Sequence, residues 1–217
     1  ASSFLPPALA RSHLCSIPPR CTPQVCSSLE LGGVTASAGL LRRVTTSLLA
    51  STPSTSPKCK VIALIRPRPG DFLLSPDDVE VALLDIDAAA AAGADGVAIG
   101  ALCPDGRIDT AACTRMIERA RRCELDEVVF HRAVDVTRPN LLEAVQQQIC
   151  PMIEQTRRDD PLSRRQLHFR LLTSGGASSA LEGAAGIAAL LARVPSIRDG
   201  TLQVSCAAGI NSGDVAS

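Results

Sequence analysis

The stretch VIALIRPRPGDF, residues 61–72, decides the fold, because it joins a buried strand directly to charged side chains. Its first five residues are all apolar, whereas strict alternation would mark a strand with one face in water. A short continuous apolar run indicates a strand that is covered on both faces, as in a parallel sheet. Arg66, Arg68 and Asp71 follow at the point where the chain leaves the core.

Comparable apolar runs recur along the chain, and each is too short to form a helix. They are VAIGAL (97–102), VVF (128–130), FRLL (169–172) and LQVSC (202–206). Helical patterns separate them, at 75–93, 109–122, 139–149 and 178–193. Ser75 followed by Pro76, and Asp109 before its helix, are typical of N-caps. Strict alternation of strand and helix predicts an α/β fold, either an open doubly wound sheet or a barrel.

Composition argues against several classes of partner. Lys plus Arg number 22 and Asp plus Glu also 22, so no overall positive field attracts nucleic acid or an anionic membrane. Trp and Tyr are absent and Phe occurs four times, which leaves few aromatic surfaces for stacking bases. No apolar run approaches the roughly 18 residues of a membrane-spanning helix. Nine scattered cysteines favour free thiols in a reducing compartment, and therefore a cytoplasmic location.

FHRAVD, residues 130–135, follows the third apolar run with His131, Arg132 and Asp135. The carboxyl ends of parallel strands open on one face, where ligands bind, so we expect these side chains there. A histidine at a strand end can act as general acid or base, with the carboxylate fixing its tautomer. The alternative is a buried histidine in a structural hydrogen-bond network.

The two arginines of residues 61–72 could have either of two roles. Arg66 and Arg68 could bind a carboxylate or phosphate in fork geometry. They could equally pair with Asp71, Asp135 and Glu30 and hold the strand ends together.

LLTSGGASS, residues 171–179, predicts a strand, a glycine turn and a helix start. The hydroxyls of Thr173 and Ser174 and the free N–H groups near Gly175 could cradle an anion. AAGIN, residues 207–211, repeats the pattern around Gly209 one strand later, as in the phosphate site of many barrel enzymes. Glycine-rich turns of this kind are also common without a ligand.

Five motifs in order resemble the CutC family: IRPRPGDF, GADGVAIGAL, FHRAVDV, LLTSGGASSALEG and the AAGI turn. The resemblance covers roughly residues 29–215. It implies a TIM (β/α)8-type barrel and a cytosolic protein, often dimeric or higher, that is linked to copper homeostasis. It also implies Cu(I) binding through cysteine thiolates, which suit this soft ion.

The sequence departs from the family pattern at its start, where the family carries cysteines at the ends of its first two strands. The second strand is read as SLEL, residues 28–31, which retains Glu30 but passes directly to glycine without a thiol. Cys26, Cys103 and Cys206 are the nearest substitutes, and the metal ligands are left open.

The expected organisation is a disordered Pro-, Ser- and Arg-rich tail at 1–28 and an incomplete barrel of about six strands at 29–217. An organelle transit peptide is the alternative for the tail. The charged residues 150–168 are expected to form a solvated loop insertion.

Three readings of function remain. The first is a CutC-type copper homeostasis protein that binds copper ions. The second is a barrel enzyme that acts on a small anion, with His131 as acid or base, Arg66, Arg68 and Arg132 as anion ligands, and Glu30 or Asp71 as partners. The third is a partial barrel without activity of its own.

Overall fold

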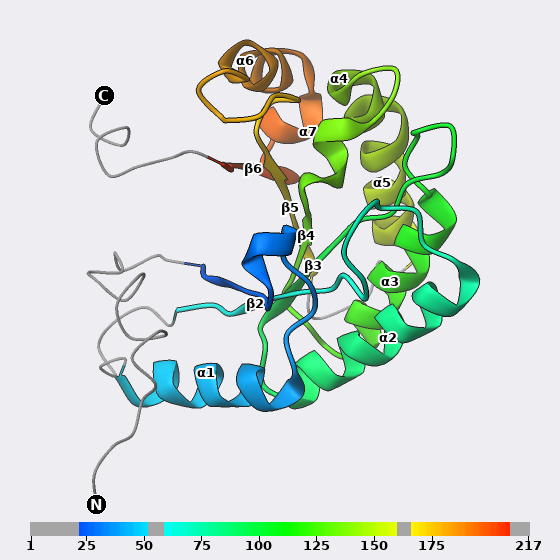
Figure 1. The fold of residues 1–217 in the computed structure, drawn as a ribbon. Coiled ribbons are helices and arrows are strands. Elements are labelled where there is room, and N and C mark those ends of the chain that lie inside the picture. Colours follow the sequence, from blue (N-terminus) through cyan, green and yellow to red (C-terminus); the bar gives the residue numbers. More distant parts are fainter. Residues whose placement is uncertain (1–21, 52–58, 160–165, 209–217) are drawn as a thin grey trace, which may run out of the picture.

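A computed structural model describes residues 22–51, 59–159 and 166–208 of the chain. Its centre is one parallel sheet whose strands lie in the order of the sequence (Figure 1). The strands are β1 (Gln24–Val25), β2 (Ile62–Leu64), β3 (Gly96–Ile99), β4 (Glu127–Phe130), β5 (His168–Thr173) and β6 (Leu202–Cys206). Sequential order in a parallel sheet with intervening helices is the arrangement of a barrel, so the incomplete α/β barrel is confirmed.

The helices lie around the outside of the curved sheet (Figure 1). They are α1 (Ala38–Ser51), α2 (Pro76–Ala91), α3 (Thr110–Arg122), α4 (Leu141–Ala144), α5 (Cys150–Asp159), α6 (Ala184–Arg193) and α7 (Pro195–Arg198). Two 3-10 turns, η1 (Leu29–Leu31) and η2 (Arg132–Val136), and a π turn, η3 (Val145–Ile149), complete the described elements. Within the described residues, no helix is both long and apolar enough to cross a membrane.

The predicted helix starts are confirmed for α2 and α3. Ser75 Oγ accepts a hydrogen bond from the Asp78 amide at 3.1 Å, and the Asp78 carboxylate accepts one from the Ser75 amide at 3.0 Å. Asp109 accepts a hydrogen bond from the Ala112 amide at 2.9 Å. These caps supply acceptors for N–H groups that the first turn of a helix leaves without partners.

The two faces of the sheet bury different sets of side chains. The face toward the helices carries the larger core, including Phe130, Phe169 and Leu171. The inner face carries a smaller apolar cluster of Ile62, Leu64, Ala98 and Val129. An ion pair lies beside this cluster, with Arg170 Nε 2.7 Å from a carboxylate oxygen of Glu127, and Arg170 Nη1 donates to Ser205 Oγ at 3.2 Å.

Two boundaries expected from the sequence are corrected. The first strand is Gln24–Val25, and residues 29–31 form a 3-10 turn instead of the strand read at 28–31. Residues 22–28 are therefore part of the fold and not of the tail assigned to 1–28. Residues 1–21 lie outside the described residues.

The segment from residue 150 was expected to be a loop, but it begins as helix α5 with Met152 and Ile153 buried. Pro151 looks like an interruption in the sequence, because it has no N–H to donate within a helix. The preceding π turn, Val145–Ile149, changes the hydrogen-bond spacing immediately before it, and the helical path continues. Residues 160–165 lie outside the described part of the chain.

Candidate functional site

The site that the sequence predicted lies at the carboxyl ends of β2, β4 and β5. Arg66 follows β2, His131 follows β4 and Ser174 follows β5, and all three are buried. Buried polar side chains need partners, so their hydrogen bonds show which of them serve the fold and which remain available.

Arg66 serves chiefly to hold two loops against β2. Its Nη1 donates to the carbonyl oxygens of Gly33 at 2.8 Å and Leu31 at 3.3 Å, and Nη2 donates to that of Gly70 at 2.6 Å. Its guanidinium carbon lies over the ring of Phe72, 4.8 Å from the centroid. Burial, followed by the charge of Arg68, lowers the pKa of Arg66. Its Nε–H is buried and has no acceptor among the described residues.

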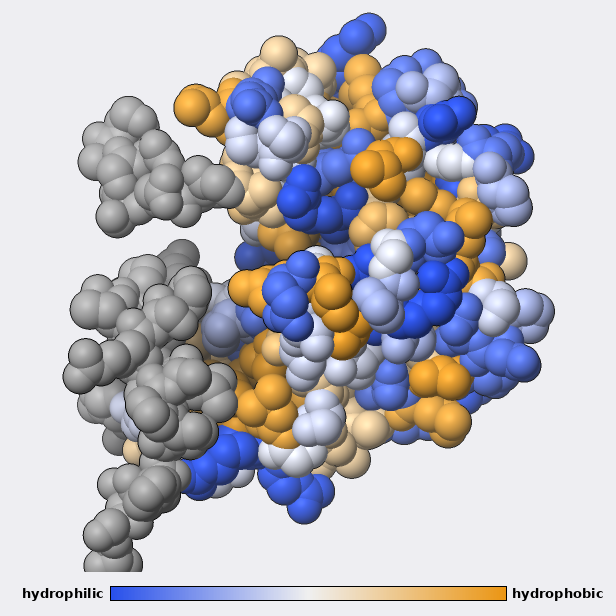
Figure 2. All heavy atoms as spheres, viewed as in Figure 1, coloured by the Kyte–Doolittle hydropathy of each residue, from blue (hydrophilic) through white to orange (hydrophobic). Residues whose placement is uncertain are grey.

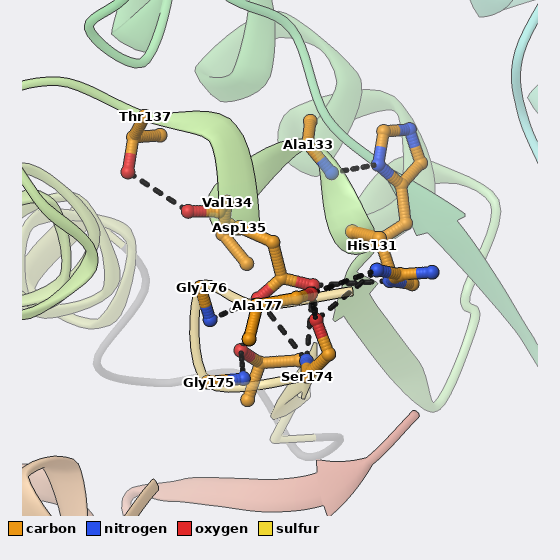
Figure 3. Close-up of polar contacts among 11 residues, drawn as sticks. His131, Ala133, Val134, Asp135, Thr137, Ser174, Gly175, Gly176 and Ala177 are labelled. Atoms are coloured by element: carbon orange, nitrogen blue, oxygen red, sulfur yellow. Dashed lines mark hydrogen bonds and ion pairs between the residues drawn. The ribbon is translucent and has the colours of Figure 1, made fainter. Parts of the chain in front are cut away.

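His131 is 4% exposed, and its imidazole points away from the carboxylate of Asp135 (Figure 3). Its Nδ1 accepts a hydrogen bond from the Ala133 amide at 3.2 Å, so the ring proton is on Nε2. Burial, reinforced by the Arg66 charge, lowers the pKa of His131 to about 4. The tautomer is therefore fixed by a backbone amide and not by a carboxylate, and the ring is neutral near neutral pH.

Asp135 joins the end of β4 to the loop after β5 (Figure 3). Its carboxylate accepts hydrogen bonds from Thr173 Oγ1, from Ser174 N at 2.9 Å and Oγ at 2.9 Å, and from Gly176 N at 3.2 Å. Arg132 Nε pairs with it at 3.1 Å. Burial acts to raise the pKa of Asp135, but these hydrogen bonds outweigh burial and hold it below its ordinary value. We call this arrangement the Asp135 latch.

The glycine turn after β5 thus surrounds the carboxylate of Asp135, which is an anion of the chain itself. The N–H groups of Ser174 and Gly176 are directed at Asp135, and Gly175 N donates to Thr173 Oγ1 at 2.9 Å. Gly175 has φ 77°, and a Cβ there would lie 2.0 Å from the Gly183 carbonyl oxygen, so only glycine fits. Gly209, predicted as a second such position, lies outside the described residues.

The remaining predicted residues stand apart from His131. Arg68 bonds Asp71 at 2.7 Å and Asp78 at 3.2 Å, so it ties the loop to the start of α2. Glu30 is exposed in η1, where the neighbouring Leu31 carbonyl, and not the Glu30 side chain, contacts Arg66.

A cavity of about 380 Å³ adjoins this region, between the loops that follow β2, β3 and β4. Its lining includes apolar and charged side chains: Asp71, Phe72, Leu73, Leu102, Cys103, Val136 and Arg138. Phe72 links it to the buried pair, because its ring lies 5.3 Å from that of His131 and also under Arg66. No sequence pattern marks Phe72 or Arg138 as site residues, because only the packing of the loops brings them to the cavity. Figure 2 shows apolar patches separated by polar residues on the viewed face.

The three candidate thiols lie on different elements. Cys26 follows β1 and packs on the inner cluster, Cys103 lines the cavity, and Cys206 ends β6 and is exposed. Burial raises the pKa of both Cys26 and Cys103. Within the described ranges, no three His, Cys, Asp or Glu side chains gather as a metal cluster.

Sequential parallel strands with polar side chains at their carboxyl ends define a barrel-type α/β protein. Residues 23–157 match the CutC family, and the chain belongs to that family.

Curated relatives agree with this assignment. A family protein CutC from Agrobacterium fabrum is 37% identical over 189 residues, covering 86% of this chain and 61% of the relative. One from Vibrio atlanticus is 34% identical over 190 residues, covering 87% and 64%. The chain therefore spans about six tenths of the length of these curated relatives.

The fold also matches a solved structure from Streptococcus agalactiae that is described as a copper homeostasis protein CutC. The TM-score is 0.71 at 21% identity, and the match covers 90% of this chain and 81% of that one.

Proposed function

We propose that this chain serves copper homeostasis in the cytosol by binding Cu(I) through the thiolate of Cys26. The observation that carries the proposal is the position of Cys26, directly after β1 at the carboxyl edge of the sheet. The family resemblance leads us to expect thiols at the ends of the first strands. Because the strand is Gln24–Val25 and not residues 28–31, Cys26 is a thiol at the end of a strand.

The surroundings of Cys26 are apolar, and its thiolate is the soft donor that this proposal assigns to the ion. The thiol packs on the apolar cluster of the inner face, and a Cβ at Gly33 would lie 3.4 Å from its Sγ. Because burial raises the pKa of Cys26, the metal must displace a proton, and we expect Cu(I) affinity to increase with pH. The described cysteines are all free thiols, in keeping with a reducing cytosol.

The test is a Cu(I) titration in competition with a chromophoric chelator, under anaerobic and reducing conditions. Cys26→Ser should weaken binding at least about tenfold, as expected when a soft ligand is replaced by a hard one. The matched control is the double variant Cys103→Ser and Cys206→Ser, which should retain the parent affinity. Unchanged affinity in Cys26→Ser would remove the basis for the proposal.

An enzyme acting on a small anion is the second candidate, and Arg66 and His131 favour it in part. Their burial beside each other at the strand ends fits ligand binding. General acid or base catalysis has less support, because His131 is neutral with a pKa of about 4 and Asp135 is fully engaged in the latch. A screen of small anions by thermal unfolding tests this candidate, and the absence of any stabilising anion would count against it.

A further inference from the structure

We propose that Arg66 and His131 together bind the carboxylate group of a small organic acid. The inference deepens the second candidate function and does not depend on copper. A chain that fails to bind Cu(I) would leave it intact.

The first support is a pair of buried donors without acceptors. Arg66 is 8% exposed and His131 4% exposed, and neither Arg66 Nε–H nor His131 Nε2–H has an acceptor among the described residues. A buried N–H that makes no hydrogen bond costs roughly 1 to 3 kcal/mol. Two such donors in one place are therefore expected to meet an acceptor from a ligand.

The second support is the register of the sheet, which brings the two side chains together. Leu64 pairs with Ala98, and Ala98 pairs with Val129, so two residues later Arg66, Gly100 and His131 stand at one level. Gly100 lies between the other two and has no side chain. A Cβ there would lie 2.6 Å from Cε1 of His131, which shows that the imidazole lies over β3, on the side of β2.

The third support is the tautomer of His131. Because Nδ1 already accepts the Ala133 amide proton, Nε2 carries a hydrogen and can only donate. A neutral imidazole in this form does not offer Nε2 to a metal ion, which needs an unprotonated nitrogen. Its partner must be an oxygen acceptor.

The charges nearby favour a single negative charge on the ligand. Within the buried pair only Arg66 carries a positive charge, because His131 is neutral. Arg68 is paired with Asp71 and Asp78, and Arg138 lies in the lining of the adjoining cavity. A carboxylate balances one guanidinium and can accept one hydrogen bond at each oxygen. A phosphate dianion would leave one charge unbalanced in a buried site, which is unfavourable.

In this proposal the organic part of the acid occupies the adjoining cavity of about 380 Å³, whose lining includes Phe72 but neither Arg66 nor His131. Phe72, Leu73, Leu102 and Val136 give it apolar walls, and Phe72 also contacts both members of the pair. An apolar body attached to the carboxylate would gain burial there.

The experiment uses the full chain labelled with ¹⁵N-histidine and titrated with sodium benzoate at constant ionic strength. The expected result is an Nε2–H tautomer for His131 and a saturable shift of its Nε2 resonance. Sodium phosphate should produce the same shift only at concentrations at least about tenfold higher, because its second negative charge has no countercharge in the buried site. An Nδ1–H tautomer, no saturable shift, or equal response to phosphate and benzoate would overturn the proposal.

Variants then assign the two donors, with benzoate binding followed by calorimetry. His131→Leu should weaken binding about tenfold, whereas His131→Gln, which keeps a donor, should stay within about threefold of the parent. Arg66→Lys should weaken it similarly, provided that circular dichroism shows a folded chain. The control is Arg107→Gln, which removes an exposed charge paired with Asp105 at 2.9 Å. If Arg107→Gln weakens binding as much as His131→Leu, the site is not the Arg66–His131 pair.

Discussion

The Asp135 latch and the Arg66–His131 pair differ in one respect that separates structure from ligand binding. His131 and Asp135 lie four positions apart in one loop, yet the Asp135 carboxylate has donors from three other residues and a paired arginine. The Arg66–His131 pair has two buried donors and no acceptor for either among the described residues. The short motif at residues 130–135 thus contains two different kinds of group. The Asp135 carboxylate has all of its hydrogen bonds within the chain, whereas His131 belongs to a pair whose buried donors lack acceptors.

Breaking the latch should give the largest effect. Asp135→Asn replaces one acceptor oxygen by an amide nitrogen that faces donors, in a side chain 3% exposed. We expect a loss of roughly 3 to 5 kcal/mol in the free energy of unfolding, because several hydrogen bonds to a buried charged group, each worth about 1.5 to 3 kcal/mol, are disturbed together. Urea denaturation measures it, with Asp71→Asn as the control, because the Asp71 side chain is 59% exposed and its replacement should change stability far less. Equal losses in both variants would show that the Asp135 carboxylate stabilises the fold no more than an exposed carboxylate does.

Lowering the pH should remove the stabilising contributions of His131 and Asp135 in two different pH ranges. The pKa of His131 is about 4 in the folded chain, below the ordinary 6.5, so the neutral ring stabilises the fold above pH 6.5. That stability, on the order of 3 kcal/mol, should be lost as pH falls from 6.5 towards 4.

The Asp135 pKa is also lowered, so its contribution should be lost only below pH 3.8. Stability curves against pH for the parent and His131→Gln measure the difference, and His168→Gln is the control for an exposed histidine. If the parent and His131→Gln lose the same stability between pH 6.5 and 4, the assignment to His131 is wrong.

Filling the space under the imidazole should have a smaller effect. Gly100→Ala places a Cβ 2.6 Å from Cε1 of His131, and overpacking of this kind costs about 1 to 3 kcal/mol. It should also shift the His131 ring resonances. Gly39→Ala is the matched control, because a Cβ there meets nothing closer than 3.9 Å and lies in helix α1. It should be neutral or stabilise by up to about 1 kcal/mol. Both are read from thermal unfolding, and a neutral Gly100→Ala would contradict the tight contact.

The smallest effect is expected from the exposed member of the latch. The Arg132 side chain is 42% exposed, although it bonds Asp135 and Ser174. Arg132→Gln should cost less than about 1 kcal/mol in the same urea experiment, as partly exposed ion pairs usually do. A loss as large as that of Asp135→Asn would mean that the arginine, and not the hydroxyl and amide donors, stabilises the carboxylate.

Most of the sheet could be predicted from the sequence, because a fully buried parallel strand leaves a continuous apolar run. Residues 62–64 and 128–130 are examples, and both lie in strands whose residues are all buried. The first strand could not, since two residues, Gln24 and Val25, carry no periodicity. Helix α5 was missed because the charge of residues 150–168 indicates a solvated loop, and only the three-dimensional path shows that Met152 and Ile153 are buried.

The positions of Arg66 and His131 at strand ends could be predicted from the sequence, but their hydrogen-bond partners could not. Arg66 and His131 stand where the apolar runs end, and this is visible in sequence. Arg66 donates to the Gly33 carbonyl of a loop that folds back from elsewhere, whereas His131 accepts from the Ala133 amide two residues further along the chain. Backbone groups are present at every residue, so no sequence pattern marks which of them will meet a side chain.

The ion pair between Glu127 and Arg170 has a consequence for how the strands find their alignment. The two side chains lie on the inner face, on neighbouring strands, 2.7 Å apart. If β5 slipped by one residue against β4, Arg170 would turn into the apolar layer under the helices. Glu127 would then remain buried without its countercharge, at a cost of several kcal/mol. Only the correct alignment of β5 with β4 therefore neutralises both charges.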